Sequence, residues 1–405
     1  MQMLLRLCGN RYVRTAFILA LSVLAAVSVI QGAKNALMFS QDFQWDAAKA
    51  LCLRADPYEL SLQPEKVRDI PELEQFYAFF TDRGLKQQME ANQFPSLLVL
   101  LAPMTLFPAG AARSVWLILN LLFTAGILFL LRKTFFRDTD TYKYAVIALL
   151  MLAGTPYRNQ LGVGQHTLFA FFFFMLAVYL DMHDDIRPVW LNNTLIALCL
   201  FVSYFKYTLT APLALYFLYR RRYREFAASV AAHAVLTAGC AAWLGKSFLY
   251  MIKAPLAVAS ALTAEGGIDL GVLLSGWSFA AAFVIAVILT VMAFRLPPQK
   301  DGYLFSLLIL WSLVLTYHRT YDFFVISSVS MMFFATVEVF GKKRQIYAAW
   351  YWILTILIYF ALRIFNENTF SKIVTGSLYY AFTLAVTYYG VKMCVNKRQG
   401  MNDNG

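Results

Sequence analysis

The sequence predicts an all-α membrane protein: a bundle of about twelve transmembrane helices with a re-entrant segment and surface helices in its first outer loop. Of the 405 residues, 60% are apolar and only 14% are charged, whereas soluble proteins are about 45–50% apolar and about 25% charged. The apolar excess runs along the whole chain and leaves no polar stretch that could form a soluble domain. We therefore expect residues 1–405 to form a single integral membrane domain.

The first transmembrane helix is expected directly after the N-terminal basic residues. Arg6, Arg11 and Arg14 precede an apolar run from Thr15 to about Val29. A signal peptide has the same order of features. The run is long for a signal peptide, and the rest of the chain is also apolar, so a membrane span is the better interpretation.

Residues 33–111 are predicted to form a loop on the outer face with helices that lie on the membrane surface. Residues 43–53 could form one such helix, with Phe43, Trp45 and Leu51 facing lipid. Residues 72–80 form a second amphipathic pattern, which fits either a helix on the membrane surface or a lid that packs on the bundle. The apolar segment 95–108 is shorter than the roughly 20 residues that a span needs, and it contains three prolines. We expect it to be re-entrant.

The remaining spans follow from apolar segments at 112–131, 143–157, 165–181, 190–205, 207–220, 226–244, 274–295, 303–317, 322–340, 346–364 and 373–393. If segment 95–108 does not cross, the clusters of Arg and Lys between these spans fall on the same side as the basic N-terminus. Cytoplasmic loops of membrane proteins accumulate such residues. The net charge of +12 therefore indicates topology, with both termini cytoplasmic, and nucleic acid is not an expected partner.

Four cations then fall on the outer face beside apolar segments: Arg158, Lys206, His318 and Arg319. Ionisable residues at membrane depth are costly and often functional, and converging cations suit a phosphate or diphosphate group. Each of them could instead extend from a helix end to the membrane surface. Asp42, at the boundary between water and lipid, could accept a proton from a hydroxyl substrate, or it could be an ordinary helix N-cap.

Metal and cofactor chemistry has little support in the sequence. The four histidines lack the spacing of a metal site, and the motifs of nucleotide-binding proteins and serine hydrolases are absent. Asp42, Asp46 and Asp322 could supply oxygen ligands to a divalent cation. The residues by themselves therefore leave a divalent metal open, and no cofactor is expected.

The outer-face motifs, read together, resemble glycosyltransferase family 87, which comprises membrane glycosyltransferases of GT-C type that use polyprenyl-phosphate sugars. The similar pieces are Asp42-Phe43 with Trp45 and then Asp56-Pro57-Tyr58, Phe94-Pro95-Ser96, Trp116 to Asn120, Gly164-Gln165-His166, Lys206-Tyr207-Thr208 with Pro212, and Tyr317 to Asp322. Arg54-Ala55-Asp56 stands where the family usually has glycine, and Phe94-Pro95-Ser96 stands where it has Tyr-Pro-Pro. Gly164-Gln165-His166-Thr167 stands in place of its Gly-Gln-x-Asn motif.

The resemblance implies an inverting transfer of a mannose- or arabinose-like sugar from a polyprenyl-phosphate donor to a lipid or glycan acceptor. By analogy, Asp42 is the base, and Lys206, Arg158, Arg319 and His318 hold the donor phosphate. Gln165, His166, Tyr58 and Trp45 would contact substrate. The resemblance also implies a site without metal. The family's occurrence implies the bacterial inner membrane.

Two other classes of function stay open at the level of sequence. A transporter or flippase of an anionic lipid-linked glycan would need a polar path through the bundle, and few ionisable residues lie within the spans. A scaffold subunit for envelope glycan assembly is the other alternative.

Overall fold

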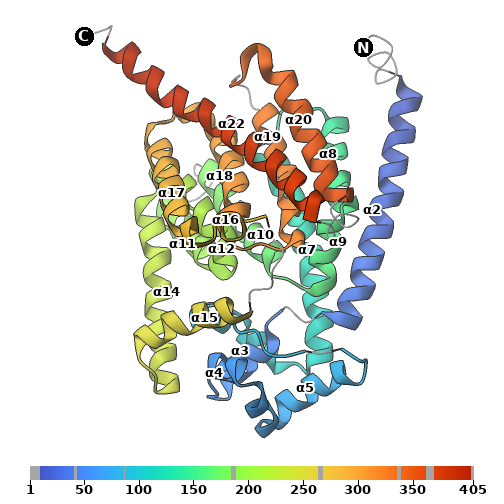
Figure 1. The fold of residues 1–405 in the computed structure, drawn as a ribbon, viewed down its shortest axis with the longest axis vertical. Helices are drawn as coiled ribbons and strands as arrows, with labels where there is room; N and C mark the ends of the chain where they lie inside the picture. The colour runs from blue at the N-terminus through green and yellow to red at the C-terminus, as the bar shows by residue number, and fades with distance from the viewer. Residues whose placement is uncertain are drawn as a thin grey trace.

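The computed structural model describes residues 10–40, 43–85, 87–183, 188–262, 268–334, 339–361 and 369–402, and the regular elements in these ranges are all helical. The long part of the molecule is a bundle of helices (Figure 1). Its main members are α2 (Arg11–Phe39), α7 (Ala109–Thr134), α8 (Thr141–Ala153), α9 (Thr155–Val163), α10 (Thr167–Met182), α11 (Val189–Ser203), α12 (Tyr207–Leu213), α13 (Leu215–Tyr219), α14 (Tyr223–Leu244), α17 (Ser278–Arg295), α18 (Asp301–Leu315), α19 (Met331–Phe334), α20 (Arg344–Ile356) and α22 (Thr369–Asn402).

A small lobe closes one end of this bundle. It contains α3 (Trp45–Cys52), α4 (Pro57–Leu62), the 3₁₀ helix η1 (Pro64–Asp69), α5 (Pro71–Thr81), α6 (Pro95–Leu101) and the 3₁₀ helix η2 (Ala102–Leu106). Helix α15 (Phe248–Leu262) contacts α4 and α14 and lies between the lobe and the bundle (Figure 1). The start of α2 and the end of α22 lie at the opposite end from the lobe.

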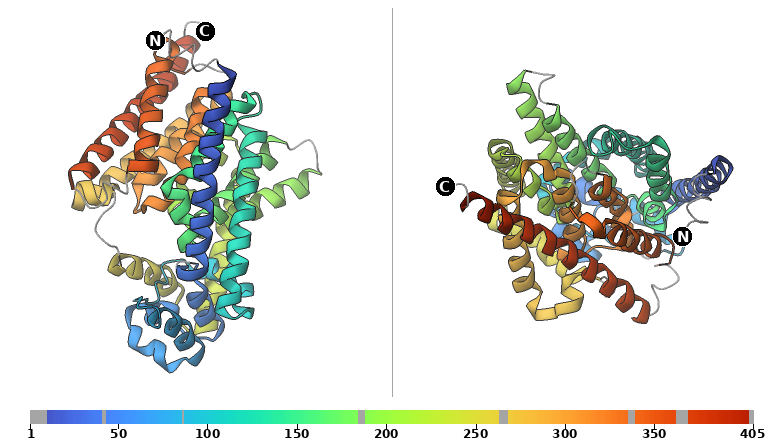
Figure 2. Two further views of the ribbon diagram at one scale, coloured as in Figure 1. Left: turned by 90° about the vertical axis from the view of Figure 1, so that its right-hand side faces the viewer. Right: turned by 90° about the horizontal axis from the view of Figure 1, so that it is seen from above.

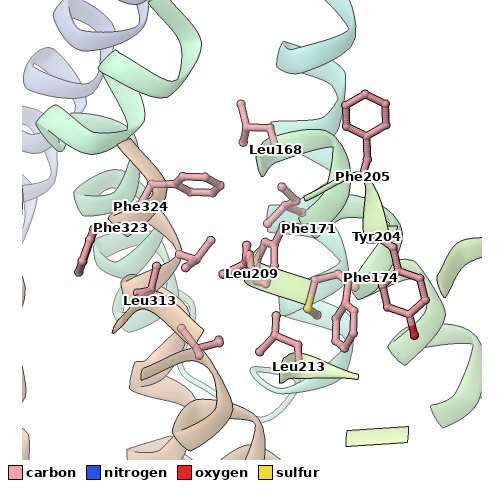
Figure 3. Packing of buried hydrophobic residues seen from close by; sticks show 14 of the residues in the cluster. Leu168, Phe171, Phe174, Tyr204, Phe205, Leu209, Leu213, Leu313, Phe323 and Phe324 are labelled. Carbon is pink, nitrogen blue, oxygen red and sulfur yellow. The ribbon is translucent and has the colours of Figure 1, made fainter. Parts of the chain in front are cut away.

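The helices of the bundle pack around α10, α12 and α18. Helix α2 lies along α7 (Figure 2) and also packs on α8 and α9, while α10 packs on α7 and α11. Leu168, Phe171 and Phe174 of α10 lie across from Leu209 of α12 and Leu313 of α18 (Figure 3). Burial of such side chains is worth about 1.5–3 kcal/mol each, so this cluster holds the centre of the bundle together.

The amphipathic helices of the lobe pack against each other, which corrects the expectation that residues of segment 43–53 face lipid. Phe43, Trp45 and Leu51 are buried. Trp45 stacks on Phe76 of α5 with ring centroids 5.4 Å apart, and its Nε1 donates a hydrogen bond to the carbonyl of Met104 at 3.2 Å. The apolar faces of α3 and α5 thus cover one another, and this pairing removes the surface that the lipid contact would need.

The segment 95–108 forms α6 and η2 and stays at the lobe end. The Tyr58 hydroxyl donates to the carbonyl of Gln93 just before the segment, and Trp45 donates to Met104 near its end. Both ends of the segment are therefore tied to the lobe, in agreement with a segment that does not cross the bundle. Its re-entrant insertion into a membrane stays a prediction.

The expected number of about twelve spans is not confirmed. Among the described residues, five helices are long and apolar enough to cross a membrane, and six if the bent pair α9 and α10 counts as one span. Segments 190–205 and 207–220 were expected to be two spans, but residues Val189–Leu213 make one candidate. Helix α18 is enclosed by other parts of the protein, since all its residues from Gly302 to Val314 are buried. Its apolar composition therefore fits a core helix as well as a membrane span. The chain is a multi-pass membrane protein with five or six candidate spans among its described residues.

An ion-pair cluster holds helices together at the end of α10 that faces away from the lobe. The Asp181 carboxylate accepts hydrogen bonds from Arg220 Nε at 2.6 Å and from Arg222 Nε at 2.5 Å. Its side chain is 1% exposed, and Arg220 also reaches Asp301 at the start of α18. Asp181 therefore connects α10 to the segment that joins α13 and α14.

Replacement of Asp181 by Asn is expected to destabilise the protein, because it removes the buried carboxylate that binds two partly buried guanidinium groups and leaves them the longer pairs with Asp301 and Glu225. Loss of one partner from a buried pair costs about 3–5 kcal/mol. Thermal unfolding in detergent should show a clearly lower midpoint for Asp181→Asn. The control is Lys66→Gln, which breaks the exposed pair with Glu59 and should change the midpoint little. Equal midpoints for both variants would contradict this role.

Candidate functional site

A polar pocket of about 290 Å³ lies where the lobe meets the bundle. The pocket is bordered by the lobe, the break between α9 and α10, the start of α12, helix α15 and the segment after α18. Its lining residues are Gln44, Glu90, Asn92, Gln93, Gln165, Lys206, Tyr207, Thr208, Leu256, Ala259, Thr316, Tyr317, Arg319, Tyr321 and Asp322. Two cations and several amides in one pocket can bind an anionic group that is attached to a hydroxyl-rich molecule.

The break between α9 and α10 places Gln165 in this pocket. The two helices meet at an angle of 107°, and Gly164 between them has a φ of +73°, in the left-handed region that favours glycine. A Cβ at this position would collide with Ser40 Oγ. The Gly164 carbonyl accepts a hydrogen bond from Trp116 Nε1 at 2.7 Å, and Gln165 Nε2 donates to the Tyr321 hydroxyl at 2.8 Å. Glycine thus permits the turn that points Gln165 at Tyr321.

Lys206 lies in the short 3₁₀ helix η4 (Tyr204–Lys206), which separates α11 from α12. Its Nζ is 3.4 Å from Asp322 Oδ2 and 3.4 Å from Gln165 Oε1. The Lys206 side chain is 11% exposed and that of Asp322 is 1% exposed. The interruption of the helix therefore places a nearly buried ammonium group at the wall of the pocket.

Asp322 binds three other side chains at the base of the pocket. It lies in the first turn of η7 (Thr320–Ser330), a 3₁₀ run whose residues from Tyr321 onward are buried. His318 Nδ1 is 2.7 Å from Asp322 Oδ2, and the Thr167 hydroxyl donates to Oδ1. With Lys206 included, both carboxylate oxygens are occupied. A carboxylate held in this way is suited to orient Lys206 and His318 and is poorly suited to take a substrate proton.

Arg319 supplies the second cation of the pocket. It is exposed, and its Nε donates to the Tyr317 hydroxyl at 3.0 Å. Because Arg319 and Lys206 line the same pocket, an anion bound there can contact both. The pairing of a nearly buried lysine with an exposed arginine provides one fixed and one adaptable cation.

The lobe contributes amides and a carboxylate to the opposite wall. Gln44 has a left-handed backbone conformation, with φ of 59°, and donates from Nε2 to the Glu90 carbonyl at 2.8 Å. The Tyr58 hydroxyl donates to the Gln93 carbonyl at 2.8 Å. Burial raises the pKa of Tyr58 well above its usual value, so its hydroxyl stays protonated as the donor. These bonds hold residues 90–93 against the pocket.

The sequence-predicted residues divide into three groups in the structure. Lys206, Arg319 and Gln165 line the polar pocket, and His318 reaches it through Asp322. Two others pack behind the lining residues. His166 is buried, with its ring centroid 4.4 Å from that of Phe205, and the Tyr58 hydroxyl donates a hydrogen bond to the carbonyl of the lining residue Gln93.

The remaining predicted residues are not lining residues of this pocket. Trp45 borders a different pocket in the lobe. Arg158 lies on α9 and does not line the polar pocket. Asp42 falls outside the described residues, although Gln44, two positions further along the chain, lines the pocket.

Sequence reasoning missed several lining residues. Glu90, Asn92 and Gln93 form a polar run directly before Phe94-Pro95, and this position beside a recognised motif could have marked them. Asp322 was predicted as the end of a family motif and as a possible metal ligand, and its spacing of four residues from His318 is the signal that could have indicated their contact. Within the described ranges, no three side chains of His, Cys, Asp or Glu lie close enough to hold a metal ion.

An apolar groove of about 380 Å³ adjoins the polar pocket. It runs between α6, α12, α14 and α15, and Tyr207 lines both the groove and the pocket. Its other lining residues include Leu97, Ala211, Val230 and Phe248, and they are mostly apolar. A molecule with an anionic end and a hydrocarbon chain could therefore place the first in the pocket and the second in the groove.

Comparison with known proteins gives one match. No curated protein and no solved structure matches the chain. The model of glycosyltransferase family 87 matches residues 95–317, more than half of the chain, including the break at Gly164, Lys206 and the groove. The chain therefore belongs to glycosyltransferase family 87, a family of GT-C type membrane glycosyltransferases.

Proposed function

We propose that this glycosyltransferase takes a mannose- or arabinose-like sugar from a polyprenyl-phosphate donor and transfers it to a lipid or glycan acceptor. The reaction takes place at the outer face of the bacterial cytoplasmic membrane. The observation that carries the proposal is that the polar pocket with Lys206 and Arg319 and the apolar groove lie side by side and share Tyr207 as a lining residue. A lipid phosphate needs both environments side by side. The family assignment also favours a transferase over a transporter.

In this proposal, Lys206 and Arg319 bind the donor phosphate, with His318 acting through Asp322. Charge grows on the phosphate oxygen as the bond between this oxygen and the sugar breaks, and fixed cations stabilise that charge more in the transition state than in the ground state. The Lys206 ammonium is already held by Asp322 and Gln165, so little reorganisation is needed. Arg158, which does not line the pocket, has the weakest support among the predicted phosphate ligands.

The acceptor hydroxyl attacks the anomeric carbon from the face opposite the phosphate. The new bond between the acceptor oxygen and this carbon forms as the bond to phosphate breaks, the phosphate leaves with the electron pair, and Asp42 takes the hydroxyl proton. This single displacement inverts the anomeric configuration. The amides of Gln44, Asn92, Gln93 and Gln165 line the pocket and are suited to bind sugar hydroxyl groups.

The arrangement of the chain supports the proposed orientation. The start of α2 and the end of α22 lie at the end opposite the lobe, as expected if both termini are cytoplasmic and the lobe is on the outer face. Lys342, Lys343 and Arg344 fall on the cytoplasmic side of this topology, in agreement with the usual distribution of basic residues.

Replacement of Asp42 by Asn should abolish transfer while donor binding is retained, because the amide cannot accept the proton. Loss of a general base costs about a hundred- to ten-thousand-fold in rate. The measurement is transfer of label from radiolabelled polyprenyl-phosphate mannose or arabinose in membranes. Glu90→Gln is the matched control, since Glu90 is a carboxylate that lines the pocket. Near-normal transfer by Asp42→Asn would contradict its role as the base. If Glu90→Gln then lost transfer, Glu90 would be assigned as the base instead.

A bulky side chain in the apolar groove should raise the KM for polyprenyl-phosphate donors with a long hydrocarbon chain. Val230→Trp fills the groove where Val230 lines it, whereas Val235→Trp alters an exposed position of the same helix that does not line the groove. We expect a raised KM for a long-chain donor only in Val230→Trp, with a smaller effect on a donor of two isoprene units. The same KM for both donors in both variants would exclude this groove as the chain-binding site.

Asp322→Asn tests the orientation of Lys206. The amide keeps the shape of the carboxylate but removes the charge that binds the ammonium, so the KM for the donor should rise roughly tenfold, the equivalent of about 1.4 kcal/mol. Thermal unfolding of the same preparation separates this effect from misfolding. An unchanged KM in a folded variant would show that Asp322 does not position Lys206.

A further inference from the structure

A second pocket, here called the lobe pocket, lies on another side of the lobe. It has a volume of about 390 Å³ between α3, α5, η2 and the start of α7, and it shares no lining residue with the polar pocket. Trp45, Phe76 and Phe79 line it, and Arg113 and Lys49 add two cations. The proposed donor site accounts for none of these groups.

Arg113 is a buried cation with unused hydrogen-bonding capacity. The residue is 3% exposed, and its Nε donates to the Ser40 carbonyl at 3.2 Å. Its Nη2 has no hydrogen-bond partner, and no carboxylate among the described residues forms an ion pair with it. A buried guanidinium without an anion is costly, which indicates that something else supplies the negative charge.

Two arginines, Arg113 and Arg83, lie near the aromatic ring of Phe79. The Arg113 guanidinium lies 4.2 Å from the Phe79 centroid, and the Arg83 guanidinium lies 3.6 Å from it. Glu72 is the carboxylate that lines the lobe pocket, and it is exposed. Among the lining residues, Lys49 and Arg113 therefore outnumber Glu72, and Arg83 adds a positive charge next to Phe79 outside the lining.

The N-terminus of α7 opens into the lobe pocket. Pro108, Ala109 and Gly110 line it, and Pro108 at the N-cap has no side chain that could cap the 26-residue helix. The free N–H groups of a helix N-terminus favour anions. Arg113 lies one turn further along this helix, so the N-terminus of α7 and the Arg113 side chain line the same pocket.

Two exposed apolar residues indicate that the anion belongs to a lipid. Leu106 is 85% exposed and Phe107 is 45% exposed, and both line the lobe pocket. They directly precede α7, a candidate membrane span. An anionic headgroup in the pocket would leave its acyl chains beside these residues.

We propose that the lobe pocket binds the phosphate-bearing headgroup of the acceptor lipid. Assignment of the bound lipid as acceptor rests on the proposed function. Described residues close to Asp42 in the sequence lie at or near both pockets: the Ser40 carbonyl accepts a hydrogen bond from Arg113, Gln44 lines the polar pocket, and Trp45 lines the lobe pocket. A headgroup in the lobe pocket would therefore contact Trp45, the residue after Gln44 of the polar pocket, and this adjacency is the reason to assign the bound lipid as the acceptor.

Binding of short-chain lipids to the purified protein in detergent tests this site. The probe is dioctanoyl phosphatidic acid, compared with uncharged dioctanoylglycerol and with inorganic phosphate. We expect measurable affinity for phosphatidic acid, about five- to tenfold weaker binding in Lys49→Gln and in Arg113→Gln, and unchanged binding in the control Lys66→Gln, which removes a lobe lysine outside this pocket. Leu106→Gln should weaken binding of phosphatidic acid and leave phosphate binding unchanged.

Equal affinities of the wild-type protein and Lys49→Gln for phosphatidic acid would overturn the proposal, and so would equal affinities for phosphatidic acid and dioctanoylglycerol. Binding of inorganic phosphate as tightly as phosphatidic acid would overturn the lipid assignment. Because these measurements need no sugar donor, they remain independent of the transfer assay. Absence of transfer in a protein with the expected binding pattern would contradict the proposed function and the acceptor role but support the headgroup site.

Discussion

Asp322 is the group on which the polar pocket depends. Its carboxylate is buried and binds Lys206 from η4, His318 from the segment after α18, and Thr167 from the start of α10. A carboxylate removed from water is unfavourable unless its oxygens are bound by donors of good geometry. The partners come from three separate parts of the chain, so this requirement draws those parts to one point and fixes the cation that faces the pocket.

The lobe depends on a different constraint, the mutual burial of α3 and α5. Trp45 and Phe76 stack across the two helices, and Tyr77 donates to the buried Asp46. This packing turns two amphipathic helices that could each bind lipid into a folded unit. Two of the pockets that this unit lines lie against the bundle and at the start of α7.

Several residues of the polar pocket could be predicted from the sequence, because charged and polar residues are rare in this apolar chain and each one marks a candidate site. Lys206, Arg319 and Gln165 were predicted from their places beside apolar segments and from the family motifs, and they do line one pocket. Glu90 and Arg113 were not predicted. Each looks like an ordinary polar residue in a loop or at a helix end, and only the packing of the lobe shows which cavity it borders.

The sequence by itself determined the helical class, the membrane setting and the family, because composition and short motifs are local properties. The number of lipid-exposed spans was decided by the tertiary structure. An apolar segment such as 303–317 has the same composition whether lipid or protein surrounds it, and only its packing shows that α18 is enclosed by other helices. The pairing of Lys206 with Asp322 across more than a hundred residues was decided in the same way, since long-range contacts depend on how the helices are arranged in space.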